Sequence, residues 1–322
     1  MTRSADIHRP EAPGDIEPAG LAYHRLTRGW TAYRWWKPLV VGVLGAGFLA
    51  VFFLVALVGL LIAGMIVPEL GRAVDGFFEG PDTLDLNNPF TLVVSLFSII
   101  LMWPALWLAT LVLGARPLGL LSSVAGRIRW SWLLRCLGVA LLVTVVAQGI
   151  SLALPGTGGD GRTPQSDGTG TLVVLAAALV LVPIQATAEE YVFRGYLMQT
   201  LGGWLRHPAF AILLPVPLFV LGHDYELLGM IDVALFAVAA GWLTWRTGGL
   251  EAAIALHIAN NLGIFVLVAF GAVDANAEDA GVVDLLVSMA MLAASILLII
   301  RLARARQIQR TSWSRTSGAS PR

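Results

Sequence analysis

The side chains of this chain that could do chemistry stand in segments that otherwise hold few polar residues. They are three charged groups, two imidazoles and one amide: Glu189, Glu190, Arg194, His223, His257 and Asn261. The sequence just before the glutamates, TLVVLAAALVLVPIQ, contains no charge. An ionisable side chain in a membrane-spanning segment carries a large free-energy cost unless it is paired or faces water, so these residues are functional candidates.

The spacing of the first group separates the two glutamates. On a helix, residues four apart share a face, whereas adjacent residues point about 100° apart. Glu190 and Arg194 are four apart, and we predict that they form an ion pair. Glu189 then lies on another face. We therefore expect Glu189 to carry the chemistry and the ion pair to support it.

The same rule groups the histidines with their neighbours. His257 and Asn261 are four apart, so an imidazole and an amide are expected to project together. Asn260 is expected to point away from that face. Phe219 precedes His223 by four residues, which places a supporting aromatic ring one turn before the other imidazole.

A carboxylate and two histidines allow two chemistries. In one, Glu189, His223 and His257 bind a divalent metal such as zinc, whose open position holds a water of lowered pKa. In the other, Glu189 itself activates water without a metal, and His257 and Asn261 donate hydrogen bonds to the oxyanion of a tetrahedral intermediate. Both hydrolyse an acyl bond. The sequence lacks HExxH, so its spacing does not choose between them.

The elements that must position these groups are transmembrane helices. Hydrophobic residues make up 57% of the chain and charged residues 13%, with a mean hydropathy of +0.76. This composition excludes a soluble protein, and the net charge of zero gives no sign of a nucleic-acid partner. Only helices satisfy the backbone of a single apolar segment within lipid. We predict an all-α fold of eight spans: 39–67, 90–113, 132–154, 171–198, 209–222, 231–246, 250–270 and 282–301.

Charge in the connecting segments predicts the orientation of the spans. Basic residues gather before the first span, in alternate loops and after the last span. Because Lys and Arg favour the cytoplasmic side, both termini are expected in the cytoplasm. The membrane is expected to be the cell membrane. Residues 1–37 are expected to be a polar, disordered tail, 38–301 the transmembrane domain, and 302–322 a basic tail. The single cysteine, Cys136, is expected to be a buried apolar residue without a disulfide.

The fifth segment, 209–222, is too short for a regular span and contains Pro215 and Pro217. A regular helix there would hold His223 far from the depth of Glu189. We therefore expect this helix to be irregular and to stop inside the membrane.

Three motifs together resemble the CPBP intramembrane proteases, also called the Abi family, which includes the type II CAAX prenyl proteases. EEYVFR matches EExxxR, FVLGH matches FxxxH, and HIANN matches HxxxN, over roughly residues 170–265. The resemblance implies an eight-helix core with a catalytic cavity open to the cytoplasm and the lipid. It also implies that Glu189 is the catalytic carboxylate, that the site is completed by His223, His257 and Asn261, and that Glu190 and Arg194 support it.

The expected function is therefore an intramembrane endopeptidase that acts on a membrane-associated peptide or a lipidated protein. One alternative is an ion- or proton-coupled transporter, in which the glutamates and histidines form a relay. Discontinuous helices in matching positions of two halves would favour it, and we find no such repeat in the sequence. Another alternative is a non-catalytic scaffold or immunity protein on the same fold.

Overall fold

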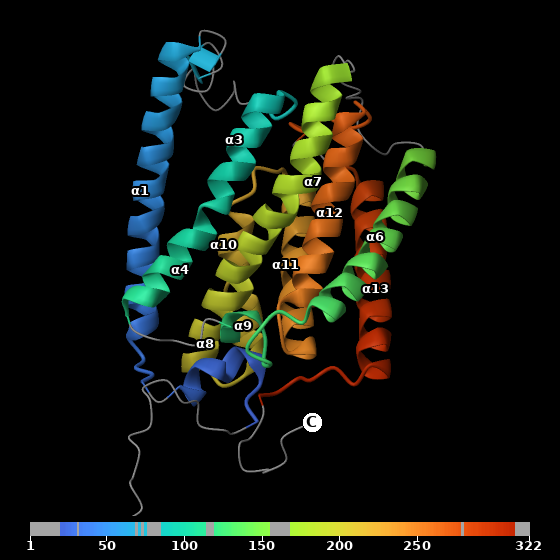
Figure 1. Ribbon diagram of the computed structural model, residues 1–322. Helices are drawn as coiled ribbons and strands as arrows, with labels where there is room; N and C mark the ends of the chain where they lie inside the picture. The colour runs from blue at the N-terminus through green and yellow to red at the C-terminus, as the bar shows by residue number, and fades with distance from the viewer. Residues whose placement is uncertain are drawn as a thin grey trace, which may run out of the picture.

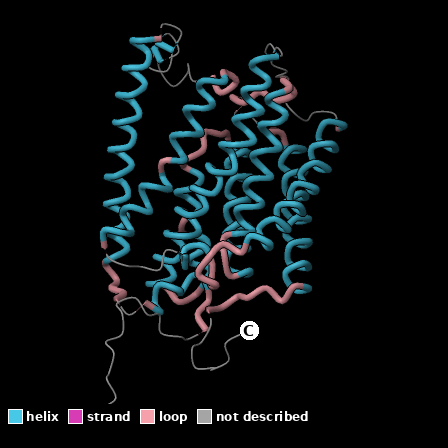
Figure 2. Tube along the Cα trace, viewed as in Figure 1, coloured by secondary structure: helices cyan, strands magenta, loops and turns pink. Residues whose placement is uncertain are grey.

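The computed structural model describes residues 20–30, 32–67, 70–71, 74–75, 85–113, 119–154, 168–277 and 280–312. Within these residues every regular element is a helix, and extended pairing is limited to two isolated bridges. The long helices run side by side as a bundle (Figures 1 and 2). The chain is thus a polytopic all-α protein, as predicted.

Seven helical spans in the described residues are long and apolar enough to cross a membrane. They are α1 (Lys37–Ile66), α3 (Pro89–Ile100) with α4 (Met102–Val112), α6 (Trp130–Ala153), α7 (Gly168–Glu190) with η3 (Tyr191–Leu197) and α8 (Met198–Trp204), α11 (Leu227–Thr247), α12 (Glu251–Ala269) and α13 (Val282–Ala305). A shorter apolar stretch, Pro208–Val220, completes the predicted set of eight.

That shorter stretch is irregular, as expected. It consists of α9 (Pro208–Leu213) and α10 (Val216–Val220), separated by a turn at Leu214 and Pro215. Pro215 and Pro217 have no backbone N–H, so an uninterrupted ladder of helical hydrogen bonds cannot form here. The chain then turns at Gly222 and His223 before α11 begins.

A second break, at Leu101 between α3 and α4, was not predicted. Pro104 lies in the first turn of α4 and cannot donate to the carbonyl of Ile100, which accounts for the break. The two halves of this span run in visibly different directions in Figure 1.

Helix α12 lies at the centre of the bundle, where it packs against α6 and α7. It is the most buried of the spans, whereas α1 lies at the edge of the bundle (Figure 1). Both α7 and α12 carry alanines with no exposed surface, among them Ala186 and Ala188 on α7 and Ala255 and Ala259 on α12. Small residues let helices approach closely in a membrane, where packing rather than water exclusion holds them together.

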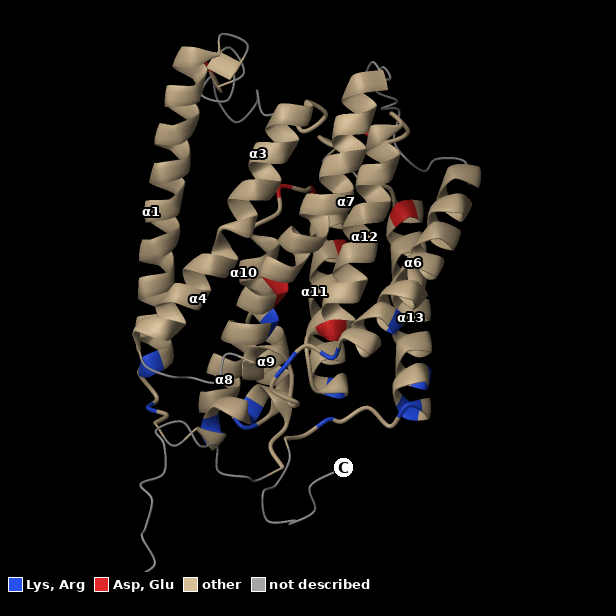
Figure 3. Ribbon diagram, in the orientation of Figure 1, with Lys and Arg blue, Asp and Glu red and all other residues tan. Residues whose placement is uncertain are grey.

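The two described ends of the chain meet at the same end of the bundle. Ala22 and Thr311 form a bridge, and Leu21 N–H donates to the Ser312 hydroxyl at 3.1 Å. Figure 3 shows that most of the Lys and Arg residues lie towards this end. An even number of spans returns the chain to its starting side, which agrees with the predicted arrangement. That this end of the bundle faces the cytoplasm stays a prediction.

The residues just before α1 differ from the expected disordered tail. Residues 20–30 contain a 3₁₀ helix, η1 (Tyr23–Gly29), which packs against α8, while residues 1–19 lie outside the described residues. Arg25 Nη1 donates to the carbonyl of Gly202 at 2.7 Å, so it caps the end of the long α7–η3–α8 helix. Gly202 is required here because a Cβ atom on it would lie 2.0 Å from the His24 carbonyl oxygen.

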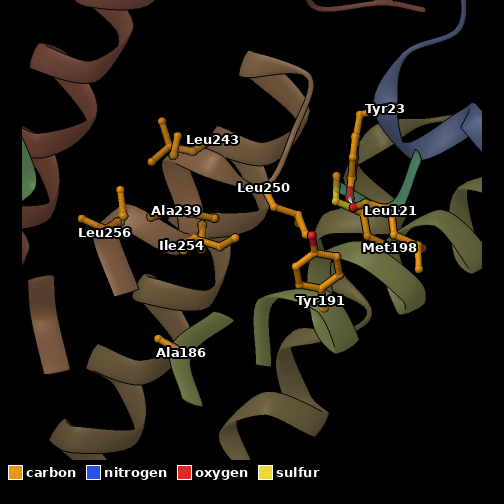
Figure 4. Close-up of a cluster of buried hydrophobic side chains, with 14 of the residues drawn as sticks. Tyr23, Leu121, Ala186, Tyr191, Met198, Ala239, Leu243, Leu250, Ile254 and Leu256 are labelled. Carbon is orange, nitrogen blue, oxygen red and sulfur yellow. Dashed lines mark hydrogen bonds between the residues drawn. The ribbon is translucent and has the colours of Figure 1, made fainter. Parts of the chain in front are cut away.

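The main hydrophobic core extends from η1, at the end of the bundle where the described chain ends meet, into the middle of the bundle. Figure 4 shows Tyr23 of η1 together with Leu121, Met198 and Tyr191, and continues to Leu250 and Ile254 on the α11–α12 side. Cys136 lies in the same core and is fully buried, as predicted.

Candidate active site

The two glutamates end α7, inside a membrane span and away from solvent. Glu190 has no exposed surface and Glu189 is 9% exposed. After them the chain continues as the π-helical turns of η3 before α8 resumes the α-helical form. Such π-helical turns are rare and often mark functional sites, because they displace side chains from regular α-helical positions.

The predicted ion pair between Glu190 and Arg194 is confirmed. Arg194 Nη1 lies 2.7 Å from Glu190 Oε1, and both side chains are buried. Arg194 Nη2 also donates to the carbonyl of Ala237 on α11 at 3.2 Å. The guanidinium lies over the Phe219 ring, 4.4 Å from its centroid, and 5.9 Å from that of Phe236. One buried cation thus ties η3 to α10 and α11.

His257 of α12 contacts both glutamates, which the helix-face argument did not anticipate. Its Nδ1 lies 2.8 Å from Glu190 Oε1, and its Nε2 lies 3.4 Å from Glu189 Oε2. Because an ionised carboxylate can only accept a hydrogen bond, His257 Nδ1 carries the ring proton and donates to Glu190. Nε2 then accepts a hydrogen bond in the neutral ring and donates one in the protonated ring. Glu190 therefore orients the imidazole as well as pairing with Arg194.

Asn261 lies one turn further along α12 and contacts a residue that sequence reasoning missed. Its Nδ2 donates to Gln185 Oε1 of α7 at 3.2 Å. Gln185 precedes Glu189 by four residues, so the rule that grouped His257 with Asn261 could have found it. Asn260 was expected to point away from this group. Instead, its Nδ2 donates to Asn261 Oδ1 at 3.2 Å.

His223 follows the end of α10, and its contact with the other site residues is made by way of the Phe219 side chain. Its Nδ1 lies 2.8 Å from the Phe219 carbonyl oxygen, and the two rings are 4.9 Å apart between centroids. The Phe219 ring is in turn 6.1 Å from that of His257. The Phe219 ring predicted to lie before His223 is therefore present. It is close to the side chains of Arg194, His223 and His257.

The three candidate metal ligands are not assembled as a ligand set. Within the part of the chain that the structure describes, no three His, Cys, Asp or Glu side chains are placed to hold a metal ion. Glu189 and His257 are close enough to share a ligand, whereas His223 makes its described contacts with Phe219 and Tyr225. Glu189 Oε2 is buried and accepts no hydrogen bond from a described residue.

A second buried ion pair sets the position of α12, and the sequence reasoning had not singled it out. Glu251, in the first turn of α12, receives two side-chain hydrogen bonds from Arg129, at 2.8 and 2.7 Å. Just before it, Gly248 caps the end of α11 with a φ of +72°, which few other residues adopt readily. These features fix where α12 begins, and hence where His257 lies along it.

Comparisons with known proteins match the region of the chain that contains these residues. Residues 170–263 match the family model described as type II CAAX prenyl endopeptidase Rce1-like. The uncharacterized protein YyaK of Bacillus subtilis (strain 168) is 29% identical over 178 residues, which cover 53% of this chain and 57% of that protein. No solved structure matches the chain. The range of the family match contains every candidate site residue from Gln185 to Asn261.

Proposed function

We propose that the chain is an intramembrane endopeptidase that hydrolyses a peptide bond in a membrane-associated or lipidated, CAAX-type substrate. The observation that carries the proposal is the pair of contacts between α7 and α12. Glu189 meets His257, and one turn away Gln185 meets Asn261. A carboxylate, an imidazole and an amide thus share one buried helix interface within a membrane span, as water activation and oxyanion binding require.

The reaction begins at the Glu189 carboxylate, which takes a proton from a water molecule. The water oxygen bonds to the carbon of the substrate carbonyl, and the π electrons of that carbonyl move onto its oxygen. Asn261 Nδ2–H donates to this oxyanion, and the protonated form of His257 adds Nε2–H. Collapse of the intermediate breaks the C–N bond, and Glu189 returns the proton to the leaving amine.

The other site residues act through this group. Glu190 and Arg194 hold the His257 ring by its Nδ1, and Phe219 packs against Arg194. His223 is proposed to reach the substrate from the end of α10. A divalent ion such as zinc would supply a water of lowered pKa. Because the described residues present no set of three ligands, we assign the base to Glu189. The cell membrane is the proposed location.

The test uses purified protein in lipid nanodiscs and a quenched fluorescent peptide with a farnesylated CAAX-type C-terminus, beside the same peptide without the lipid. We expect cleavage of the lipidated probe and none by Glu189→Gln. Glu226→Gln is the matched control, because it makes the same chemical change at an exposed residue outside the site. Full activity of Glu189→Gln, or no cleavage of either peptide by the natural protein, would overturn the proposal.

A further inference from the structure

Gln185 is a polar residue of the site interface that lies outside the three sequence motifs. It lies on α7 one turn before Glu189, and it is only 4% exposed. Helices α7 and α12 run antiparallel, since Glu189 meets His257 while the earlier Gln185 meets the later Asn261. The two contacts are therefore successive steps of one interface (Figure 1). Gln185 contacts Asn261 across this interface, just as Glu189 contacts His257.

The Asn261 amide lies between two other amides, those of Asn260 and Gln185. Asn260 donates to Asn261 Oδ1, and Asn261 Nδ2 donates to Gln185 Oε1, each at 3.2 Å. In this arrangement Asn261 Oδ1 faces Asn260 and Asn261 Nδ2 faces Gln185. An amide nitrogen carries two hydrogens. One is taken by Gln185, and the other stays available for the substrate.

We infer that Gln185 is a positioning residue, which holds the Asn261 amide so that its second N–H points to the oxyanion. The inference rests on the proposed function, because it assumes that Asn261 binds the substrate carbonyl oxygen. Donors stabilise a transition state best when they are already oriented before charge develops. Without the acceptor on Gln185, the Asn261 amide could rotate and turn its oxygen toward the substrate oxygen, which would repel the developing charge.

Gln185→Met tests the inference, because methionine has a similar length and shape but lacks the carbonyl acceptor. With the farnesylated peptide, we expect kcat to fall about two- to tenfold, the equivalent of one ordinary hydrogen bond, with KM within about twofold of the natural value. Thr187→Val is the matched control on the same helix, because the Thr187 hydroxyl bonds to the Pro183 carbonyl and not to α12. The control should keep its kcat.

Combining the change with Asn261→Ala separates positioning from a general effect on structure. If Gln185 acts through Asn261, then Gln185→Met should lower kcat no further in the Asn261→Ala protein, within about twofold. Equal losses in both backgrounds would refute the inference, as would an unchanged kcat for Gln185→Met in the natural chain. As a second measurement, binding of a phosphonate analogue of the tetrahedral intermediate should weaken by the same factor as kcat.

Failure of the inference can be told apart from failure of the proposed function. If Asn261→Ala lowers kcat and Gln185→Met does not, the endopeptidase mechanism stands and the role given to Gln185 is wrong. If Asn261→Ala leaves kcat unchanged, the oxyanion role itself is wrong, and the inference falls with it.

Discussion

Replacing Glu190 by glutamine tests the division of labour between the two adjacent glutamates. The variant keeps the shape of the side chain but removes its charge. Glu190 has no exposed surface, and its Oε1 receives both Arg194 Nη1 at 2.7 Å and His257 Nδ1 at 2.8 Å. The change therefore leaves a buried guanidinium without its counter-ion.

The expected loss follows from the contacts that Arg194 keeps. Breaking a buried ion pair by removing one partner costs about 3–5 kcal/mol. Arg194 retains its bond to the Ala237 carbonyl and its position over the Phe219 ring, an interaction that contributes roughly 0.5–2 kcal/mol. We therefore expect the lower end of the range, a loss of about 3 kcal/mol in unfolding free energy. Turnover should also fall, because His257 loses the carboxylate that orients its ring.

The assay is equilibrium unfolding in mixed detergent micelles, followed by far-UV circular dichroism. Glu189→Gln is the comparison, because Glu189 Oε2 lies 3.4 Å from His257 Nε2, longer than an ordinary hydrogen bond. We expect this variant to change the unfolding free energy by less than about 1 kcal/mol. If Glu190→Gln matched the natural protein in stability while Glu189→Gln unfolded readily, the assignment of roles would be reversed and our reasoning refuted.

Three further predictions concern the metal, the topology and the packing of η1. Purified protein should contain less than one equivalent of zinc, and a chelator should leave cleavage unchanged; loss of both activity and metal in His257→Ala would instead support a metal mechanism. Cysteines placed at Arg306 and Asn276, both exposed, should be labelled from opposite sides of the membrane, and labelling from one side would contradict the span model. Burial lowers the pKa of His24 from its usual 6.5, so the neutral ring favours the folded state above that value, and this contribution is lost as pH falls below it. Proteolysis of the segment before α1 should therefore speed up between about pH 7 and 5 in the natural protein and much less in His24→Gln.

Several features of this protein could be predicted from local patterns. The length of the apolar segments predicted the positions of all eight helices. A helix in lipid must form its backbone hydrogen bonds within its own segment and cannot depend on distant partners for them. The i, i+4 spacing predicted the contact between Glu190 and Arg194, and the prolines of the fifth segment predicted its break. These features depend only on residues within one or two helical turns.

Contacts between helices depend on depth and rotation, which the sequence does not state. His257 could be grouped with Asn261, but that its Nδ1 would bond Glu190 followed only from the packing of α12 on α7. The depth of α12 depends in turn on Arg129, a residue of another loop. Asn260 also leaves its expected direction, because a flexible amide can bend toward a partner that its backbone does not face.

The sequence by itself thus determined that the protein is a bundle of membrane helices with a small set of polar groups, and it identified the pairs that share a helix face. The tertiary structure alone decided which helices meet, and so made one interface from Gln185, Glu189, His257 and Asn261. The physical reason is that the packing of α12 on α7 is a property of two helix surfaces together, and small residues such as the buried alanines of both helices permit close approach. No residue spacing within a single helix contains that information.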